Sequence, residues 1–175
     1  MFLPPSFARA QVGTYPRGID HAFGRTELRS QPRRLVTIGY GDEAPFLALG
    51  HKPIGIVYSG MFASGMTPWC EQKFGAQKPD LLDGSMIDFE AIARLKPDLI
   101  VGVFSQLDAV SYGRLSRIAP TIAYRSGPWR AGWREQTDIA GAILGLDETA
   151  RQLIVETERL LRSYGDAYPD LKGKS

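Results

Sequence analysis

Short apolar runs alternate with longer amphipathic segments along most of this chain. Runs rich in β-branched and other apolar residues predict buried strands at residues 35–38, 54–58, 99–104 and 121–124. Segments with one apolar face predict helices over residues 44–49, 89–95, 112–118, 130–144 and 147–164. This alternation predicts an α/β fold with a mostly parallel sheet flanked by helices.

Capping and turn residues mark several ends of these segments. Asp88 or Ser85 is the candidate N-cap of one helix, which Pro97 should end. Gly145 should end another, and Asp147 should then cap the longest helix of the chain. The apolar positions of that last helix keep one stripe, and such a stripe needs a partner surface.

Two stretches lack a helical period. Residues 15–30 contain short apolar stretches around a turn at Gly24 and predict an N-terminal β-hairpin. Residues 59–84 hold several glycines and two prolines, so we expect loops there.

Composition excludes several classes of protein. The 175 residues suit one domain, and 21 Lys and Arg against 19 Asp and Glu leave a net charge of +2, too mild for a nucleic-acid-binding surface. No apolar run approaches the roughly 18 residues of a membrane span. Cys70 is the single cysteine, and His21 and His51 have no carboxylate at ligand spacing, so we expect no metal site.

Candidate ligand contacts lie in the loops after the predicted strands, because ligands of open α/β sheets bind beyond the carboxyl ends of the strands. The residues there that can stack, donate or pair with an anion are Arg125, Trp129, Tyr40, Tyr58, Phe104 and Ser105. Trp129 and Trp133 are four residues apart, however, and would also fit one core stripe.

The segment Gly39–Ala44 fits the relaxed dinucleotide pattern G-x-G-x-x-A directly after a strand. A Rossmann-like nucleotide-binding enzyme is therefore one alternative. Asp42 and Glu43 argue against it, because they place negative charge where a pyrophosphate would lie. Both acids open a predicted helix, so we favour helix capping over a paired-carboxylate active site. We expect Cys70 to be a buried or loop thiol and not a nucleophile.

Five fragments occur in an order that resembles one protein family. They are residues 32–38 (PRRLVTI), 46–56 (FLALGHKPIGI), 89–100 (FEAIARLKPDLI), 112–120 (YGRLSRIAP) and the helix around Trp133. This order resembles the N-terminal lobe of the periplasmic binding proteins that serve iron–siderophore and cobalamin ABC importers. The resemblance runs from about Tyr15 onward and implies a Rossmann-like lobe.

The resemblance also implies a division of the chain. Residues 1–14 would be a disordered leader or signal remnant, although they lack a basic region and contain prolines. Residues 15–146 would form the substrate-binding lobe, 147–167 a long interlobe helix, and 168–175 the start of a second lobe that the chain lacks. The lipid-anchoring cysteine of many relatives has no counterpart either.

By this resemblance the chain would be the solute-binding component of an ABC importer for ferric siderophores or similar chelates, and not an enzyme. Haem and cobalamin stay open as ligands. The protein would act in the periplasm or another extracytoplasmic space, beside a membrane permease. No cofactor is implied, because the iron would arrive inside its chelator. Arg125 would pair with chelate oxygens, and Trp129, Tyr40 and Tyr58 would stack on its flat parts.

Glu90 matches a family position that docks onto permease arginines, where charge complementarity orients a transient interface. The alternative is a helix-surface ion pair with Arg94, four residues on. A further alternative for the whole chain is self-association through the apolar stripe of residues 147–164.

Overall fold

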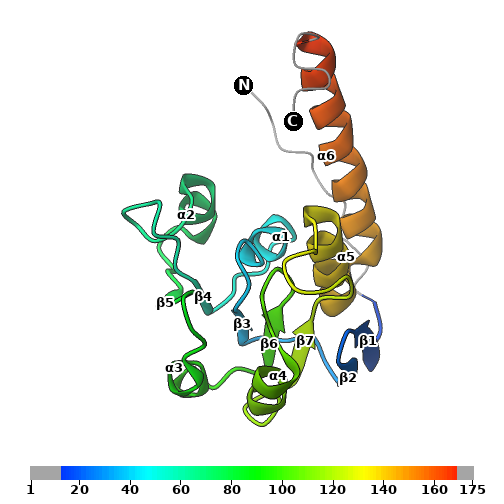
Figure 1. Cartoon of the computed structure of the whole chain (residues 1–175). Helices are drawn as coiled ribbons and strands as arrows, with labels where there is room; N and C mark the ends of the chain where they lie inside the picture. Colours follow the sequence, from blue (N-terminus) through cyan, green and yellow to red (C-terminus); the bar gives the residue numbers. More distant parts are fainter. Residues whose placement is uncertain (1–12, 169–175) are drawn as a thin grey trace.

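A five-stranded parallel sheet forms the centre of the fold in the computed structural model, which describes residues 13–168 (Figure 1). Its strands are β3 (Leu35–Thr37), β4 (Gly55–Val57), β5 (Asp80–Leu82), β6 (Leu99–Gly102) and β7 (Thr121–Ala123). They lie in the order β5-β4-β3-β6-β7, and every neighbouring pair is parallel. All residues of β3, β4, β6 and β7 are buried, as is typical of parallel strands covered on both faces.

Helices cover both faces of this sheet, which confirms the predicted α/β class. On one face lie α1 (Glu43–Ala48), α2 (Pro68–Phe74) and α5 (Trp133–Leu144), and on the other lie α3 (Phe89–Arg94) and α4 (Ala109–Leu115) (Figure 1). From β3 the chain runs outward to β4 and β5, and it then returns to β6 on the other side of β3. The direction of winding therefore changes between β3 and β6, and ligands of open α/β sheets bind at such a switch point.

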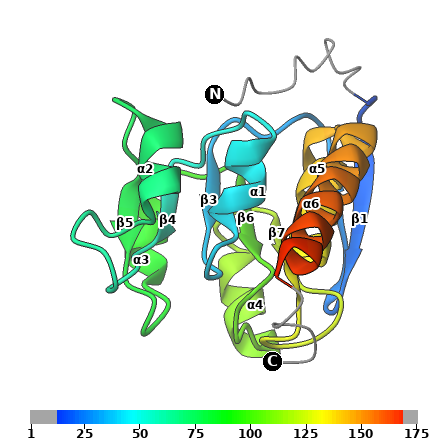
Figure 2. The same ribbon diagram turned by 90° about the horizontal axis from the view of Figure 1, so that it is seen from above.

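The structure confirms the N-terminal hairpin. β1 (Arg17–His21) pairs antiparallel with β2 (Gly24–Leu28). The hairpin lies on the β7 side of the sheet (Figure 2), where Thr26 Oγ1 donates to the Thr121 carbonyl at 2.7 Å. It therefore covers a sheet edge that would otherwise expose unpaired backbone groups.

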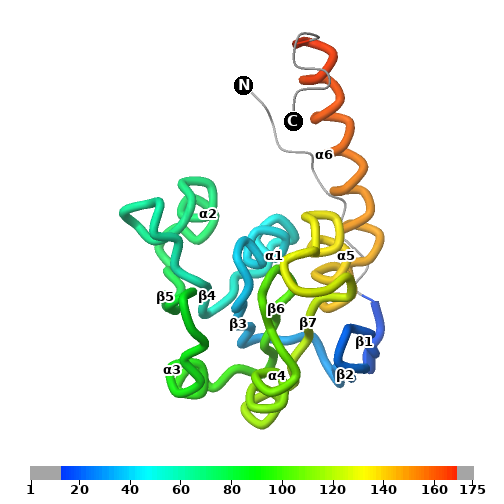
Figure 3. The backbone as a smooth tube through the Cα atoms, viewed as in Figure 1, coloured from blue at the N-terminus to red at the C-terminus, as the bar shows by residue number. Residues whose placement is uncertain are grey.

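A long helix, α6 (Asp147–Ala167), follows α5 and confirms the predicted C-terminal helix. Its first half packs against α5, and its outer half projects away from the sheet (Figures 1 and 3). The outer half exposes Leu160, Leu161 and Tyr164, whose exposed fractions are 49%, 54% and 58%. No helix within residues 13–168 is long and apolar enough to cross a membrane.

Asp147 does not cap α6, contrary to the sequence prediction. It is the first helical residue, the cap position falls to Leu146, and no side chain caps the helix. Arg17 of the hairpin pairs with the Asp147 carboxylate instead, with Nη2 2.5 Å from Oδ2. The carboxylate thereby ties β1 to the start of α6, where its negative charge also suits the helix dipole.

The stretch 59–84 is more regular than predicted, because it contains α2 and β5. Thr67 Oγ1 caps α2 by accepting the Cys70 N–H at 3.2 Å, and Pro68 stands in the first helical turn. Cys70 and Phe74 are buried in a small second core, which also contains Leu47, Ile56 and Met66. Most of this stretch is nevertheless loop, as the sequence predicted.

Candidate ligand-binding face

A pocket lies at the switch point of the sheet, beyond the carboxyl ends of β3 to β6. Its lining includes Ile38, Tyr40, Gly84, Ile87, Ser105 and Trp129. Its volume of about 40 Å³ holds a few water molecules at most, whereas sites for small-molecule ligands occupy roughly 300–1,000 Å³. Alone, this pocket is too small to enclose such a ligand.

Tyr40, Phe104 and Trp129 gather beside the pocket and are called the aromatic cluster below. The ring centroid of Trp129 lies 5.8 Å from that of Tyr40 and 5.3 Å from that of Phe104. The first contact is tilted, with an interplanar angle of 40°, and the second is edge-to-face at 79°, which is a favoured arrangement for aromatic pairs. Tyr40 and Trp129 remain 42% and 43% exposed. The cluster therefore presents apolar ring surface on which a flat ligand group can stack.

The backbone of Trp129 fixes its place in the cluster. Its φ is 55°, which is uncommon for a residue other than glycine, and its N–H donates to the Ser105 carbonyl at 3.0 Å. Helix α5 begins at Trp133 and not at residue 130 as predicted, so Trp129 lies outside it. The alternative of a core stripe shared by the two tryptophans is therefore wrong.

Ser105 lines the pocket, but its hydroxyl is engaged within its own loop. Oγ donates to the Gly102 carbonyl at 3.0 Å and accepts the Leu107 N–H at 3.3 Å. The residue is buried, with 6% exposure. Its hydroxyl therefore stabilises the loop after β6 that carries Phe104.

Asp42 stands at the cap position of α1 but does not cap that helix, so the helix-capping prediction was wrong. Its buried carboxylate reaches across to the loop after β6 instead. Oδ2 accepts the Val103 N–H at 2.7 Å, and Oδ1 accepts the Phe104 N–H at 3.0 Å. Gln136 Nε2 of α5 donates to Oδ1 at 2.8 Å. Burial raises the pKa of Asp42 to about 6, although these three donors favour the ionised form.

Glu43 is buried next to Cys70, whose Sγ donates to Oε1 at 3.6 Å. Burial raises the pKa of Glu43, and burial likewise raises the pKa of the Cys70 thiol to about 11. A thiol with so high a pKa is a poor nucleophile, which agrees with the expectation of an unreactive cysteine. The two adjacent acids thus have different partners and do not form a paired-carboxylate site.

Three of the six predicted residues, Tyr40, Ser105 and Trp129, line the pocket. Phe104 lies beside it in the aromatic cluster, whereas Arg125 and Tyr58 belong to neither. Arg125 Nη1 pairs with Asp138 Oδ2 of α5 at 2.5 Å, and Nε donates to the Asp20 carbonyl at 3.3 Å. Tyr58 follows β4 and is 43% exposed. The structure therefore commits Arg125 to contacts with α5 and the hairpin, and a role in ligand binding remains a prediction for both residues.

Residues 56–175 match the family described as periplasmic binding protein. The chain belongs to the periplasmic binding protein family. Among curated proteins it is 25% identical over 166 residues to a probable siderophore-binding lipoprotein, YfiY, of Bacillus subtilis. That match covers 91% of this chain and 48% of the relative, so the chain spans about half the length of the curated relatives it matches.

Solved structures of periplasmic binding proteins show the same fold. The iron-uptake protein PiaA of Streptococcus pneumoniae, in complex with ferrichrome, has a TM-score of 0.80 and 37% identity, over 90% of this chain and 54% of that one. SirA of Staphylococcus aureus, complexed with staphyloferrin B, has a TM-score of 0.70 and 27% identity, over 88% and 52%. The family and these neighbours are binding proteins.

Glu90 lies in the first turn of α3 and is exposed. No ion pair joins it to Arg94 in the part of the chain that the structure describes. The helix-surface pair expected as the alternative is therefore not formed, and docking to a permease stays a prediction.

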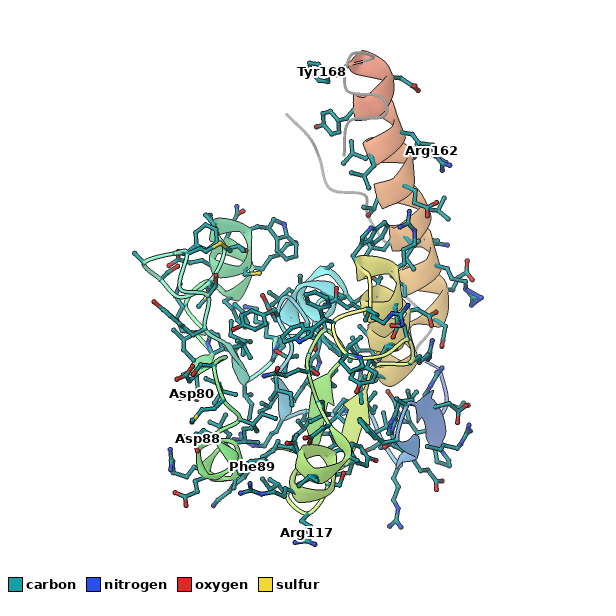
Figure 4. The ribbon with its side chains drawn as sticks, in the orientation of Figure 1. Asp80, Asp88, Phe89, Arg117, Arg162 and Tyr168 are labelled. Atoms are coloured by element: carbon teal, nitrogen blue, oxygen red, sulfur yellow. The ribbon has the colours of Figure 1, made fainter. Side chains whose placement is uncertain are left out.

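Sequence reasoning missed the wall of the pocket that connects β5 to α3. Gly84, Met86 and Ile87 line it, and Asp88 at its end caps α3 by accepting the Ala91 N–H at 2.8 Å (Figure 4). A side chain at Gly84 would overlap the Tyr40 hydroxyl, so this glycine lets Tyr40 lie across the wall. No sequence pattern marked β5, the strand before this wall, because β5 is an edge strand with two exposed residues out of three.

Metal-binding groups do not gather in this lobe. Among residues 13–168, no three His, Cys, Asp or Glu side chains are placed to hold a metal ion. His21 instead contacts Thr26 Oγ1 through Nε2 at 2.9 Å and packs against the Tyr112 ring.

Proposed function

We propose that this chain is the N-terminal lobe of the substrate-binding component of an ABC importer for ferric siderophores or related iron chelates. The aromatic cluster at the switch point of the sheet carries the proposal. It is exposed, preorganised and located where open α/β folds bind ligands. The siderophore-binding relatives supply the ligand class.

The small pocket supports a site shared between two lobes. A ferric chelate is far larger than about 40 Å³, so only one side of it would rest on the aromatic cluster. The other side would rest on a second lobe, with α6 as the connection between them. The absence of a metal-ligand group in residues 13–168 fits a cargo in which the chelator already occupies the iron.

The delivery step would place the protein outside the cytoplasm, next to a membrane permease. One relative named as a siderophore-binding lipoprotein and another named as an ABC transporter substrate-binding lipoprotein support this location. Glu90 is the proposed contact to the permease, because it is exposed and its carboxylate has no partner in Arg94. Rim charges of this kind contribute orientation and association rate more than affinity.

Tryptophan substitution tests the ligand-binding face. Titration of the 175-residue chain with a ferric hydroxamate siderophore should quench its intrinsic fluorescence saturably. Trp129→Phe should remove most of that quenching, because Trp129 is the tryptophan of the aromatic cluster. Trp69→Phe is the matched control, since Trp69 on α2 has 42% exposure but does not line the pocket.

Two results would contradict the proposal. One is the absence of saturable quenching in the unsubstituted chain up to about 1 mM chelate, which corresponds to less than roughly 4 kcal/mol of binding free energy. The other is an equal loss of quenching in both variants, because the chelate would then bind away from the aromatic cluster.

A further inference from the structure

The glycine-containing segment after β3 has a structural use that the nucleotide pattern does not explain. A Cβ at Gly39 would overlap Asp42 Oδ2 and would lie 2.8 Å from the Phe104 carbonyl oxygen. Gly41 has a φ of 73°, which turns the chain into α1. The two glycines therefore allow the Asp42 carboxylate to lie against the loop after β6.

Asp42 is connected to the backbone of all three residues of the aromatic cluster through hydrogen bonds and the loop after β6. The carboxylate holds the Phe104 N–H, and the Phe104 carbonyl accepts the Tyr40 N–H at 2.9 Å. The next residue of the loop, Ser105, accepts the Trp129 N–H through its carbonyl at 3.0 Å. Gln136 donates to both the Asp42 carboxylate and the Tyr40 carbonyl, at 2.8 and 3.3 Å.

We propose that Asp42 is the positioning residue of the ligand-binding face, and that its carboxylate fixes the aromatic cluster by holding the loop after β6. Asp42 is 1% exposed and lies beneath the cluster, so it does not contact the ligand itself. The expected effect of Asp42 on the affinity for a ferric siderophore rests on the proposed function. The effect on the geometry of the cluster is independent of any ligand.

Ionisation of Asp42 should affect how firmly it holds the loop after β6, because all three of its hydrogen-bond partners are donors. The carboxylate can accept from all of them, whereas a protonated carboxyl group adds a fourth donor and must lose or weaken one of these bonds. Its pKa of about 6 puts this change near pH 6. Among the described residues, the titratable group whose charge acts on Asp42 is Glu43, the first residue of α1. The groups that contact Asp42 from α5 and from the loop after β6 are uncharged.

Fluorine NMR of the ligand-free chain tests the geometry directly. With fluorotryptophan incorporated, the three tryptophans give separate signals, and those of Trp69 and Trp133 serve as internal controls. The Trp129 signal should shift with a midpoint near pH 6. In Asp42→Asn it should differ from the unsubstituted chain at pH 7.5 and should no longer show that midpoint.

Glu43→Gln is the matched control, because Glu43 is also a buried acid at the start of α1 but contacts Cys70 and not the loop. It should leave the position of the Trp129 signal at pH 7.5 in place and keep a Trp129 titration, with its midpoint moved to lower pH because the Glu43 charge raises the pKa of Asp42. The inference is overturned if Asp42→Asn leaves the Trp129 signal and its titration unchanged. If Asp42→Asn does not fold, hydrogen exchange of the unsubstituted chain decides, since unprotected Val103 and Phe104 amides would show that the Asp42 carboxylate does not hold the loop and would also overturn the inference.

Affinity separates this inference from the proposed function. Asp42→Asn should weaken binding of the ferric siderophore about tenfold, the effect of one lost charge-assisted hydrogen bond. The affinity of the unsubstituted chain should fall below pH 6, and that of Asp42→Asn should not follow the same curve. If no ferric chelate binds at all, the proposed function fails, while the fluorine signals still decide the role of Asp42.

Discussion

Trp129 has a backbone conformation that is uncommon for residues other than glycine. A positive φ of 55° costs on the order of 1–3 kcal/mol in a residue with a side chain, and surrounding contacts must maintain it. Here the Ser105 carbonyl accepts its N–H, and the rings of Tyr40 and Phe104 pack against its own. The ring is thus fixed before a ligand arrives, which lowers the entropy that binding must overcome.

Substitution of Glu90 is expected to affect docking to a permease without affecting ligand binding. Glu90→Ala should leave quenching by the ferric chelate unchanged, because Glu90 does not line the pocket. It should reduce association of the complete receptor with permease-containing vesicles, and transport with it. Glu27→Ala, at an exposed glutamate of β2, is the control and should change neither quantity. Equal transport by Glu90→Ala and the unsubstituted receptor would contradict the docking role.

The loops after the strands could be named from the sequence, but their internal contacts could not. Tyr40, Ser105 and Trp129 were identified because the carboxyl ends of parallel strands meet at one edge. Asp42 was assigned to helix capping because local sequence shows only its neighbours, whereas its partners Val103 and Phe104 lie 61 and 62 positions away. The same limit applies to Arg125, which pairs with Asp138 and does not line the pocket.

Among the elements, α5 and α6 pack most closely where they carry small residues. A Cβ at Gly141 would overlap the Ala150 side chain, so the two helices approach each other at this point. The Leu146 N–H also donates to the Gly141 carbonyl at 2.8 Å, and Gly145 turns the chain with a φ of 70°. This contact sets the direction in which α6 leaves the lobe.

Gly141→Ala should therefore destabilise the chain, even though alanine favours helices more than glycine does. Overpacking a buried contact costs typically 1–3 kcal/mol, which exceeds the gain of about 1 kcal/mol in helix propensity. Urea unfolding followed by circular dichroism measures the difference. Gly165→Ala in α6 is the control, because nothing lies within 4 Å of its added Cβ, and it should be neutral or stabilising. A Gly141→Ala chain as stable as Gly165→Ala would contradict the close packing.

Periodicity predicted the buried strands and the long helix well and the exposed edge strand poorly. The strands with continuous apolar runs and the helix α6 match their predicted positions, since burial on both faces or on one stripe leaves a clear pattern. β5 is an edge strand with two exposed residues out of three, so it leaves no such pattern. For α2 a signal was present in Thr67 and Pro68, which are typical of a helix N-terminus.

For the whole molecule, the pocket and α6 both indicate surfaces that another unit would complete. The pocket encloses only about 40 Å³, and both Arg162 in the outer half of α6 and Tyr168 just after the helix lie far from the sheet (Figure 4). The chain spans about half the length of its curated relatives. Packing of α6 against a second lobe, and self-association through its apolar stripe, both stay predictions. The predictions for residues 1–12 and 169–175 lie outside the described residues.

The most direct test of the account is to map a bound ferric siderophore on this chain by paramagnetic broadening of amide NMR signals. Ferric iron broadens signals near it, and the gallium form of the same chelate is the diamagnetic control. We predict selective loss of signals from Tyr40, Gly84, Ser105 and Trp129, with those of α2 and the hairpin retained. Broadening centred on another surface, or no selective broadening, would contradict the assignment of the switch-point face as the ligand-binding face.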